Sequence, residues 1–166
     1  MVKSKTVLIA AAIATAGIVI FFVFYFSDKA VIKRRFHYLA QQLDKESPEN
    51  NLLSAAKAKH IGDMFADNCR VYLPGYDVDR TFNGRDVHPY VMMARARYKD
   101  ISLEFYDFNI DIPHEGVALV DVTAFVKAIS ASGETRREIH ELAFSLEQHE
   151  TDWLFTDIES VTVLER

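Results

Sequence analysis

Val117–Ser130, with the sequence VALVDVTAFVKAIS, is the stretch that decides the fold class. Successive side chains of a β-strand point to opposite faces of its sheet. One face of this run would carry Val120, Val122, Ala124 and Val126, and the other Leu119, Asp121, Thr123 and Phe125. The run therefore predicts a long strand with one apolar face and one mixed face.

Similar runs lie on both sides of this strand. They are rich in β-branched and aromatic residues and span Ile101–Ile112, Glu134–Gln148 and Trp153–Leu164. The segments between them are short and polar, at 113–116, 131–133 and 149–152. Long strands joined by short polar turns predict an antiparallel meander.

The first half of the chain has helical spacing instead. Ile32, Phe36, Leu39 and Leu43 are four, three and four residues apart, which predicts a helix from Ser27-Asp28 to about Lys45. A second helix is predicted from Leu52 to about Asp67, after the break at Ser47-Pro48-Glu49-Asn50. Its inward residues would be Leu53, Ala56, Ile61, Met64 and Phe65.

A short strand, Arg70–Leu73, is expected to stop at Pro74-Gly75. Asp86 would cap a third helix, with Pro89 in its first turn. Its inward residues would be Val87, Val91, Ala94 and Tyr98. Three helices followed by a meander predict an α+β domain whose curved antiparallel sheet wraps the helices and leaves a cavity on its concave face.

Three strings support a more specific assignment. They are Met64–Asn68 leading into Val71–Pro74, then Phe82–Asp86, and the closing Trp153-Leu154-Phe155. With the order of elements, they resemble the nuclear-transport-factor-two-like superfamily, which includes SnoaL-like and ketosteroid-isomerase-like proteins. The resemblance covers roughly residues 28–165 and implies a cone-shaped roll of three helices on a curved sheet. It implies no single activity, because one fold hosts many functions.

The resemblance also implies where a catalytic base would lie. The family's isomerases place a carboxylate just before the proline that ends the first short strand. The matching position here is Leu73, which cannot accept a proton. A non-enzymatic role is therefore favoured over the isomerase mechanism.

A hydrophobic segment precedes the domain. Residues 7–26 read VLIAAAIATAGIVIFFVFYF and contain no charge. Twenty helical residues span about 30 Å, which matches the hydrocarbon core of a bilayer. We therefore expect a short flank at 1–6, a transmembrane anchor at 7–26 and the α+β domain at 27–166. A cleaved signal peptide is the alternative, but its apolar region usually has about 7–15 residues.

The charges indicate location and partners. Residues 27–166 contain 17 basic and 24 acidic residues, a net charge of −7, which argues against a nucleic-acid partner. Basic residues flank both ends of the apolar segment, so the orientation stays open. We favour a single-pass protein of the inner (cytoplasmic) membrane with its domain on the extracytoplasmic, periplasmic side. The bilayer would be one partner, and a homodimer or an envelope protein another.

Candidate site residues are few. Asp121 and His140 would form an acid–base pair only if both faced the concave side of the sheet; Tyr38, Tyr106 and Phe125 are further pocket candidates. The six histidines lack metal-site spacing, and no glycine loop suits a phosphate, so neither a metal nor a cofactor is expected. Arg95 and Arg97 are interpreted as solvated residues.

These observations lead to three functional hypotheses. The first is a membrane-anchored, non-enzymatic binding or assembly domain. The second is an isomerase, dehydratase or hydrolase that uses Asp121 and His140. The third is an accessory subunit of a membrane complex.

Overall fold

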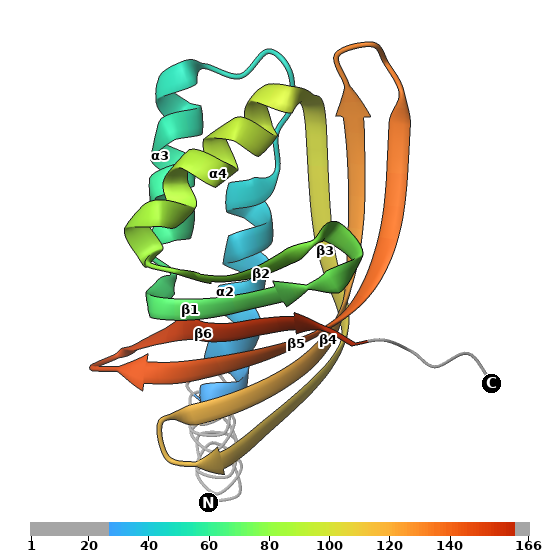
Figure 1. Cartoon of the computed structure of the whole chain (residues 1–166). Helices are drawn as coiled ribbons and strands as arrows, with labels where there is room; N and C mark the ends of the chain where they lie inside the picture. Colours follow the sequence, from blue (N-terminus) through green and yellow to red (C-terminus); the bar gives the residue numbers. More distant parts are fainter. Residues whose placement is uncertain (1–26, 162–166) are drawn as a thin grey trace, which may run out of the picture. The chain divides into compact units, whose positions relative to one another are not determined.

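The computed structural model of the protein describes residues 27–161 (Figure 1). The chain divides between Arg34 and Arg35 into two compact units, and the second contains all the strands described below. The predicted anchor at 7–26 lies outside the described residues. Within residues 27–161, no helix combines the length and the apolar character needed to cross a membrane.

Three helices and six strands make up the described chain. The helices are α2 (Asp28–Leu43), α3 (Asn51–Gly62) and α4 (Gly84–Arg97), and a 3-10 turn, η1, spans Pro74–Tyr76. The strands are β1 (Phe65–Leu73), β2 (Val78–Phe82), β3 (Tyr98–His114), β4 (Val117–Ser130), β5 (Thr135–His149) and β6 (Asp152–Ser160). The sheet curves around the helices, which confirms the α+β prediction (Figure 1).

The six strands form one sheet in the order β2-β1-β6-β5-β4-β3. The predicted meander from β3 to β6 is confirmed, and all its pairs are antiparallel. The expectation of a fully antiparallel sheet is wrong, because β1 pairs with β6 in parallel. A parallel pair needs a long crossover connection, and the chain between β1 and β6 supplies one.

The region between α3 and α4 departs most from the prediction. Helix α3 ends at Gly62 rather than near Asp67, and β1 already begins at Phe65. A Cβ at Gly62 would lie 2.7 Å from the carbonyl oxygen of Gly84, so only glycine permits this approach between the two helices. Helix α4 is capped by Asn83 rather than Asp86: the Asn83 side chain accepts a hydrogen bond from the Arg85 amide.

An aromatic cluster joins helix α2 to the concave face of the sheet. The ring of Phe36 meets those of Phe105, Phe144 and Phe155 edge to face, with centroids 4.8–5.2 Å apart. This arrangement suits the quadrupoles of aromatic rings. The predicted tryptophan-bearing last strand is confirmed, and Trp153 is buried. This cluster fills one part of the concave face and leaves the rest to the cavity described below.

The inward faces of α3 and α4 were predicted only in part. Ile61, Met64, Val87 and Val91 are buried as expected, but Leu53, Ala56 and Ala94 are exposed. In α4, the buried position after Val87 and Val91 is taken by Arg95 and not by the neighbouring Ala94. The Arg95 residue is only 1% exposed. The interpretation of Arg95 as a solvated residue is wrong.

Arg95 is buried because it satisfies several acceptors at once. Its guanidinium donates to the carbonyl oxygens of Gln42 (3.0 Å) and Leu43 (2.7 Å), which end α2. It also donates to Ser54 Oγ (3.0 Å) and Glu49 Oε1 (2.6 Å). The last carbonyls of a helix have no partner within the helix. Arg95 thus joins the end of α2 to α3 and α4.

Candidate functional site

A cavity of about 710 Å³ lies between the helices and the concave face of the sheet. Pockets that bind small molecules typically measure about 300–1,000 Å³ and are mostly apolar with a few polar groups. This cavity matches that description, since most of its wall is aliphatic or aromatic. Its apolar lining includes Leu39, Leu43, Ile61, Phe65, Leu73, Val87, Val91, Leu103, Phe105, Ala124, Val126, Leu142, Phe144 and Ile158.

One polar cluster interrupts the apolar wall, and it consists of Tyr76, Glu138 and His140. The Tyr76 hydroxyl donates to Glu138 Oε2 and lies 2.9 Å from His140 Nε2. The same Nε2 is 3.2 Å from Glu138 Oε2. Tyr76 comes from η1, after β1, whereas the other two residues lie two positions apart on β5 and therefore on one face of it.

The charges of the cluster follow from these contacts. Hydrogen bonds from Tyr76 and His140 hold the pKa of Glu138 below its usual value, because they stabilise the carboxylate, and this outweighs its partial burial. Burial, together with the hydrogen bond to Glu138, raises the pKa of Tyr76 to about 12. At neutral pH the cluster therefore presents an ionised carboxylate and a neutral phenol.

The structure does not bring Asp121 and His140 together. His140 pairs in register with Ala124, and both line the cavity. Asp121 is three residues from Ala124 along β4, so its side chain points to the outer face of the sheet. There it is exposed and accepts a hydrogen bond from Asn109 Nδ2 (3.1 Å). The predicted acid–base pair is not formed.

Among the four pocket candidates, His140 lies in the cavity wall and the other three lie outside it. Tyr38 on α2 is 41% exposed, with its ring beside that of His60. Tyr106 is 46% exposed and donates to Glu104. Phe125 follows Ala124 on β4 and so belongs to the outer face.

Sequence reasoning missed two of the three cluster residues. Alternation along β5 places Glu138 on the face of His140, so a signal for it existed. Tyr76 follows Pro74-Gly75 in a turn, and no local pattern connects it with a residue 62 positions away. Leu73, at the position of the family's catalytic base, does line the cavity, so the wall is apolar at that point.

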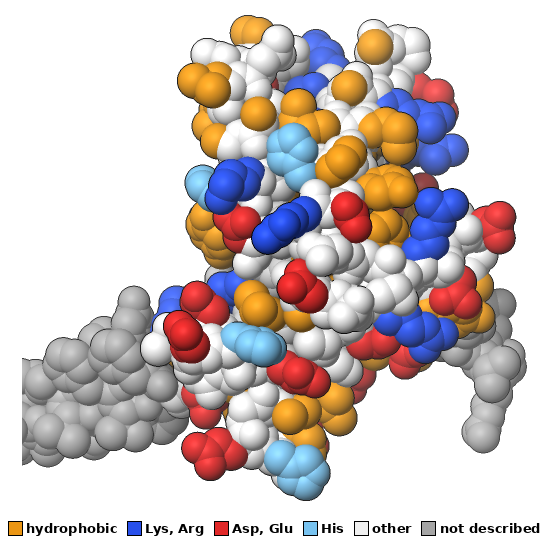
Figure 2. Space-filling view, turned by 60° about the vertical axis from the view of Figure 1, so that its left-hand side comes forward, with side chains coloured by type: hydrophobic (Ala, Val, Ile, Leu, Met, Phe, Trp, Pro, Cys, Tyr) orange, Lys and Arg blue, Asp and Glu red, His pale blue; other side chains and the backbone are white. Residues whose placement is uncertain are grey.

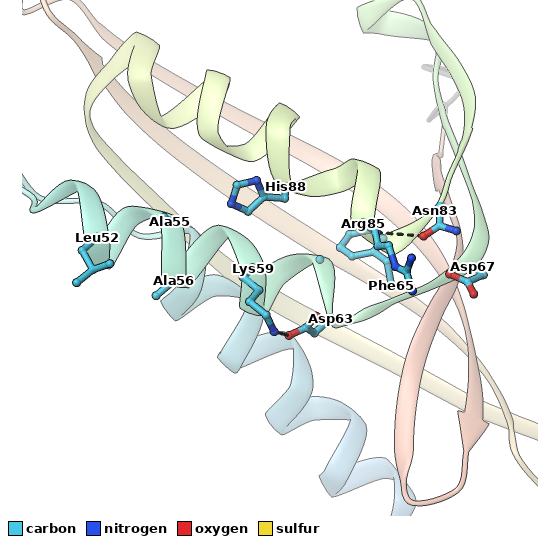
Figure 3. Close-up of a pocket in the computed structure, with 12 residues that line it drawn as sticks. Leu52, Ala55, Ala56, Lys59, Asp63, Phe65, Asp67, Asn83, Arg85 and His88 are labelled. Carbon is cyan, nitrogen blue, oxygen red and sulfur yellow. Dashed lines mark hydrogen bonds and ion pairs between the residues drawn. The ribbon is translucent and has the colours of Figure 1, made fainter.

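A second hollow lies on the surface between α3 and α4 (Figure 3). Figure 2 shows hydrophobic side chains gathered over this helical face, where Leu52, Leu53 and Met93 are each at least half exposed. The hollow measures about 740 Å³, and its lining includes the small residues Ala55, Ala56 and Gly62 of α3. In Figure 3 its Lys59 points toward Asp63, and the two form an ion pair of 2.7 Å. Two of the charged residues that line this hollow, Lys59 and Asp63, thus pair with each other.

Metal coordination gains no support from the side-chain positions. Within residues 27–161, no three His, Cys, Asp or Glu side chains lie close enough together to hold a metal ion. Cys69 is buried next to the β1–β6 pair, and burial raises the pKa of its thiol to about 12. A thiol in this state is a poor ligand and a poor nucleophile.

Comparisons with known proteins identify the fold. The sequence matches no protein-family profile and is not significantly similar to any curated protein. Solved structures do resemble it. A protein of Novosphingobium aromaticivorans, assigned provisionally as an aromatic ring hydroxylase, has a TM-score of 0.68 at 12% identity and covers 83% of this chain and 90% of its own.

Two further structures give the same result. A provisional scytalone dehydratase of Novosphingobium aromaticivorans has a TM-score of 0.62 at 16% identity, covering 80% of this chain and 82% of its own. A provisional calcium/calmodulin-dependent protein kinase II association domain of Xanthomonas campestris has a TM-score of 0.65 at 11% identity, covering 84% and 91%. At these identities the likeness concerns the fold, which is nuclear-transport-factor-two-like.

Proposed function

We propose that the domain binds one small, mostly apolar molecule in the cavity between its helices and its sheet. The observation that carries this proposal is the apolar volume of about 710 Å³ with a single polar cluster in its wall. Filling such a cavity with an apolar ligand removes apolar surface from water on both partners, which is favourable by roughly 25 cal/mol per Å² before the costs of binding. The polar cluster would fix the orientation of the ligand.

The lining of the cavity supports binding over the isomerase mechanism. A carbon acid needs a carboxylate or another base within reach of its proton. Leu73 lines the wall where the family's isomerases have that base. Among the described residues that line the cavity, Glu138 has the only carboxylate, and it already accepts hydrogen bonds from Tyr76 and His140.

The bound molecule itself provides the test. We would purify the full-length protein from its native membranes, extract it with organic solvent and identify the released molecules by mass spectrometry. Ala124→Phe adds bulk inside the cavity, whereas Ala143→Phe makes the same change on the outer face of the neighbouring strand. The proposal expects one molecule in wild type and in Ala143→Phe that is missing from Ala124→Phe. Equal extracts from all three proteins would refute it.

A second candidate function is acid–base catalysis by the Tyr76–Glu138–His140 cluster. The specific observation in its favour is that His140 Nε2 lies within hydrogen-bond distance of both a phenol and a carboxylate. An isomerase or a dehydratase would move a carbon-bound proton through this histidine. Deuterium from heavy water should then enter the bound molecule in wild type and not in His140→Asn. A wild-type protein that exchanges no deuterium is a binder.

The anchor belongs to the proposal as well. Residues 7–26 would hold the domain against the inner membrane on its extracytoplasmic side, where a ligand from the bilayer is near. A protease cleavage site placed after Arg166 tests the orientation. We expect an added protease to cleave this site in cells in which only the outer membrane has been permeabilised. Cleavage only after the inner membrane is lysed would place the domain in the cytoplasm.

The outer face of the sheet is the proposed surface for a homodimer. Leu119 and Ile139 are 46% and 68% exposed, and Phe125 pairs with Ile139 on the same face. Burial of these side chains against a second copy would be favourable. Light scattering should give twice the monomer mass for wild type and the monomer mass for Ile139→Lys. A monomeric wild type would contradict the dimer.

A further inference from the structure

The hydrogen bonds of the Tyr76–Glu138–His140 cluster determine which polar group a ligand can bring to it. The phenol hydrogen of Tyr76 is donated to Glu138 Oε2. The carboxylate is ionised and has no hydrogen to donate. His140 Nε2 faces this same oxygen at 3.2 Å, so Nε2 carries a hydrogen and donates it to the carboxylate. The Tyr76 hydroxyl and His140 Nε2 therefore both donate to Glu138.

The Glu138 carboxylate keeps acceptor positions for a ligand. The two carboxylate oxygens of Glu138 offer about four acceptor positions. Tyr76 and His140 both bind Oε2, so the positions on Oε1 accept no hydrogen bond from the cluster. Arg136 lies on the same face of β5 as Glu138, with its Nη1 3.8 Å from Oε1, but it is not among the residues that line the cavity.

We propose that the cavity selects apolar molecules with a hydrogen-bond donor, an alcohol or an amine, over the corresponding ketones; this inference rests on the proposed binding function. A hydroxyl or an amine hydrogen can be donated to Glu138. A ketone oxygen there would face the carboxylate with no hydrogen between the two oxygens. An unsatisfied polar group in a partly desolvated wall costs about 1–3 kcal/mol.

Ser160 is the other polar side chain in the lining, and it does not change this preference. A serine hydroxyl both donates and accepts. It would therefore accommodate a ketone and an alcohol alike. The discrimination comes from Glu138, whose ionised form accepts only.

A matched series of rigid bicyclic molecules tests the inference: decalin, 2-decalol and 2-decalone. The full-length protein in amphipol is labelled with ¹³C at its methyl groups, and each compound is titrated. The shifts of Val126 and Leu142 report the cavity, and those of Leu119 report the outer face. We expect 2-decalol to bind about tenfold more tightly than 2-decalone, which corresponds to one net hydrogen bond. Equal affinities or a preference for the ketone would overturn the inference.

Two variants assign the preference to Glu138. Glu138→Gln adds amide donors and removes the charge, so the alcohol-to-ketone ratio should fall to about one. Glu141→Gln makes the same change on the outer face of β5, where its carboxylate accepts from Thr123 Oγ1 (3.0 Å), and should leave the ratio at about ten. An unchanged ratio in Glu138→Gln would also overturn the inference.

Decalin separates this inference from the proposed function. If decalin shifts the cavity methyls and 2-decalol gains nothing over 2-decalone, the cavity binds apolar molecules without the proposed selectivity. If none of the three compounds shifts Val126 or Leu142, the proposed binding function fails, and the inference fails with it.

Discussion

The domain contains two polar clusters built around a glutamate, and they differ in what surrounds them. Glu49 is bound by Arg95 and Lys57, and the Glu49 and Arg95 side chains are only 4% and 1% exposed. Glu138 is bound by Tyr76 and His140 in the cavity wall, and its side chain is 35% exposed. Arg95 bonds to protein groups that α2, α3 and the connecting loop supply, whereas the Glu138 cluster faces the apolar cavity.

The difference separates a structural role from a binding role. A buried ion pair whose hydrogen bonds all go to protein joins the elements that supply them, and losing one partner leaves an unpaired charge. A half-exposed cluster contributes little to stability, since solvent screens it. It keeps acceptors available for a ligand. The first cluster should therefore govern unfolding, and the second should govern binding.

The largest expected effect comes from breaking the buried cluster. Arg95→Met removes the donor to the carbonyl oxygens of Gln42 and Leu43, and it leaves the buried Glu49 carboxylate with Lys57 alone. We expect the free energy of unfolding to fall by about 3–5 kcal/mol, measured by urea denaturation. Arg97→Met, on the exposed side of the same helical turn, should change it by less than about 0.5 kcal/mol. Similar losses in both variants would contradict the structural role of Arg95.

A smaller effect is expected in the pH dependence of stability. Burial alone would raise the pKa of Glu49, but the hydrogen bonds and charges of Arg95 and Lys57 outweigh it, so the pKa lies below the usual 4.5. The unfolded chain therefore binds the proton more readily. The stabilisation by Glu49 is complete above pH 4.5 and is lost as the pH falls through the lower, folded-state pKa.

Unfolding of wild type and Glu49→Gln at several pH values measures this effect. The difference in unfolding free energy, about 1–3 kcal/mol near neutrality, should shrink steadily below pH 4.5. The same series with Glu141→Gln, an exposed glutamate, serves as the control. A difference that stays constant down to pH 2 would show that Glu49 is not the titrating group.

The smallest effect on stability is expected in the cavity cluster. Tyr76 is 52% exposed, so Tyr76→Phe should change the free energy of unfolding by no more than about 0.5 kcal/mol. Its ionisation is more informative. Ultraviolet titration of wild type minus Tyr76→Phe should show one phenol with a pKa of about 12. In Glu138→Gln that phenol should ionise at lower pH, because the carboxylate that accepts its hydrogen is gone; an unchanged value would contradict the Tyr76–Glu138 contact.

The two clusters also show how far the sequence predicts the structure. Alternation placed Val117–Ser130 as a strand with its bounds as observed, and it placed Glu138 beside His140. Both are local patterns with a period of two. The resemblance to the nuclear-transport-factor-two-like superfamily predicted the fold, and it drew attention to Leu73, which lines the cavity.

The missed features depend on contacts far along the chain. Arg95 was interpreted as solvated because nothing near it in the sequence shows that Glu49 and the end of α2 supply its acceptors. Tyr76 reaches Glu138 across 62 positions, and β1 pairs with β6 in parallel across a longer stretch of chain. The sequence left open whether Asp121 faces the cavity, because alternation defines two faces of a strand without showing which one meets the helices.

The central claim is that the cavity holds one small molecule, and native mass spectrometry of the full-length protein tests it most directly. The protein is taken from its own membranes and compared with Ala124→Phe. The account predicts a wild-type mass that exceeds the polypeptide by a single ligand, with no such increment in Ala124→Phe. A wild-type mass equal to that of the polypeptide alone, or the same increment in both proteins, would contradict it.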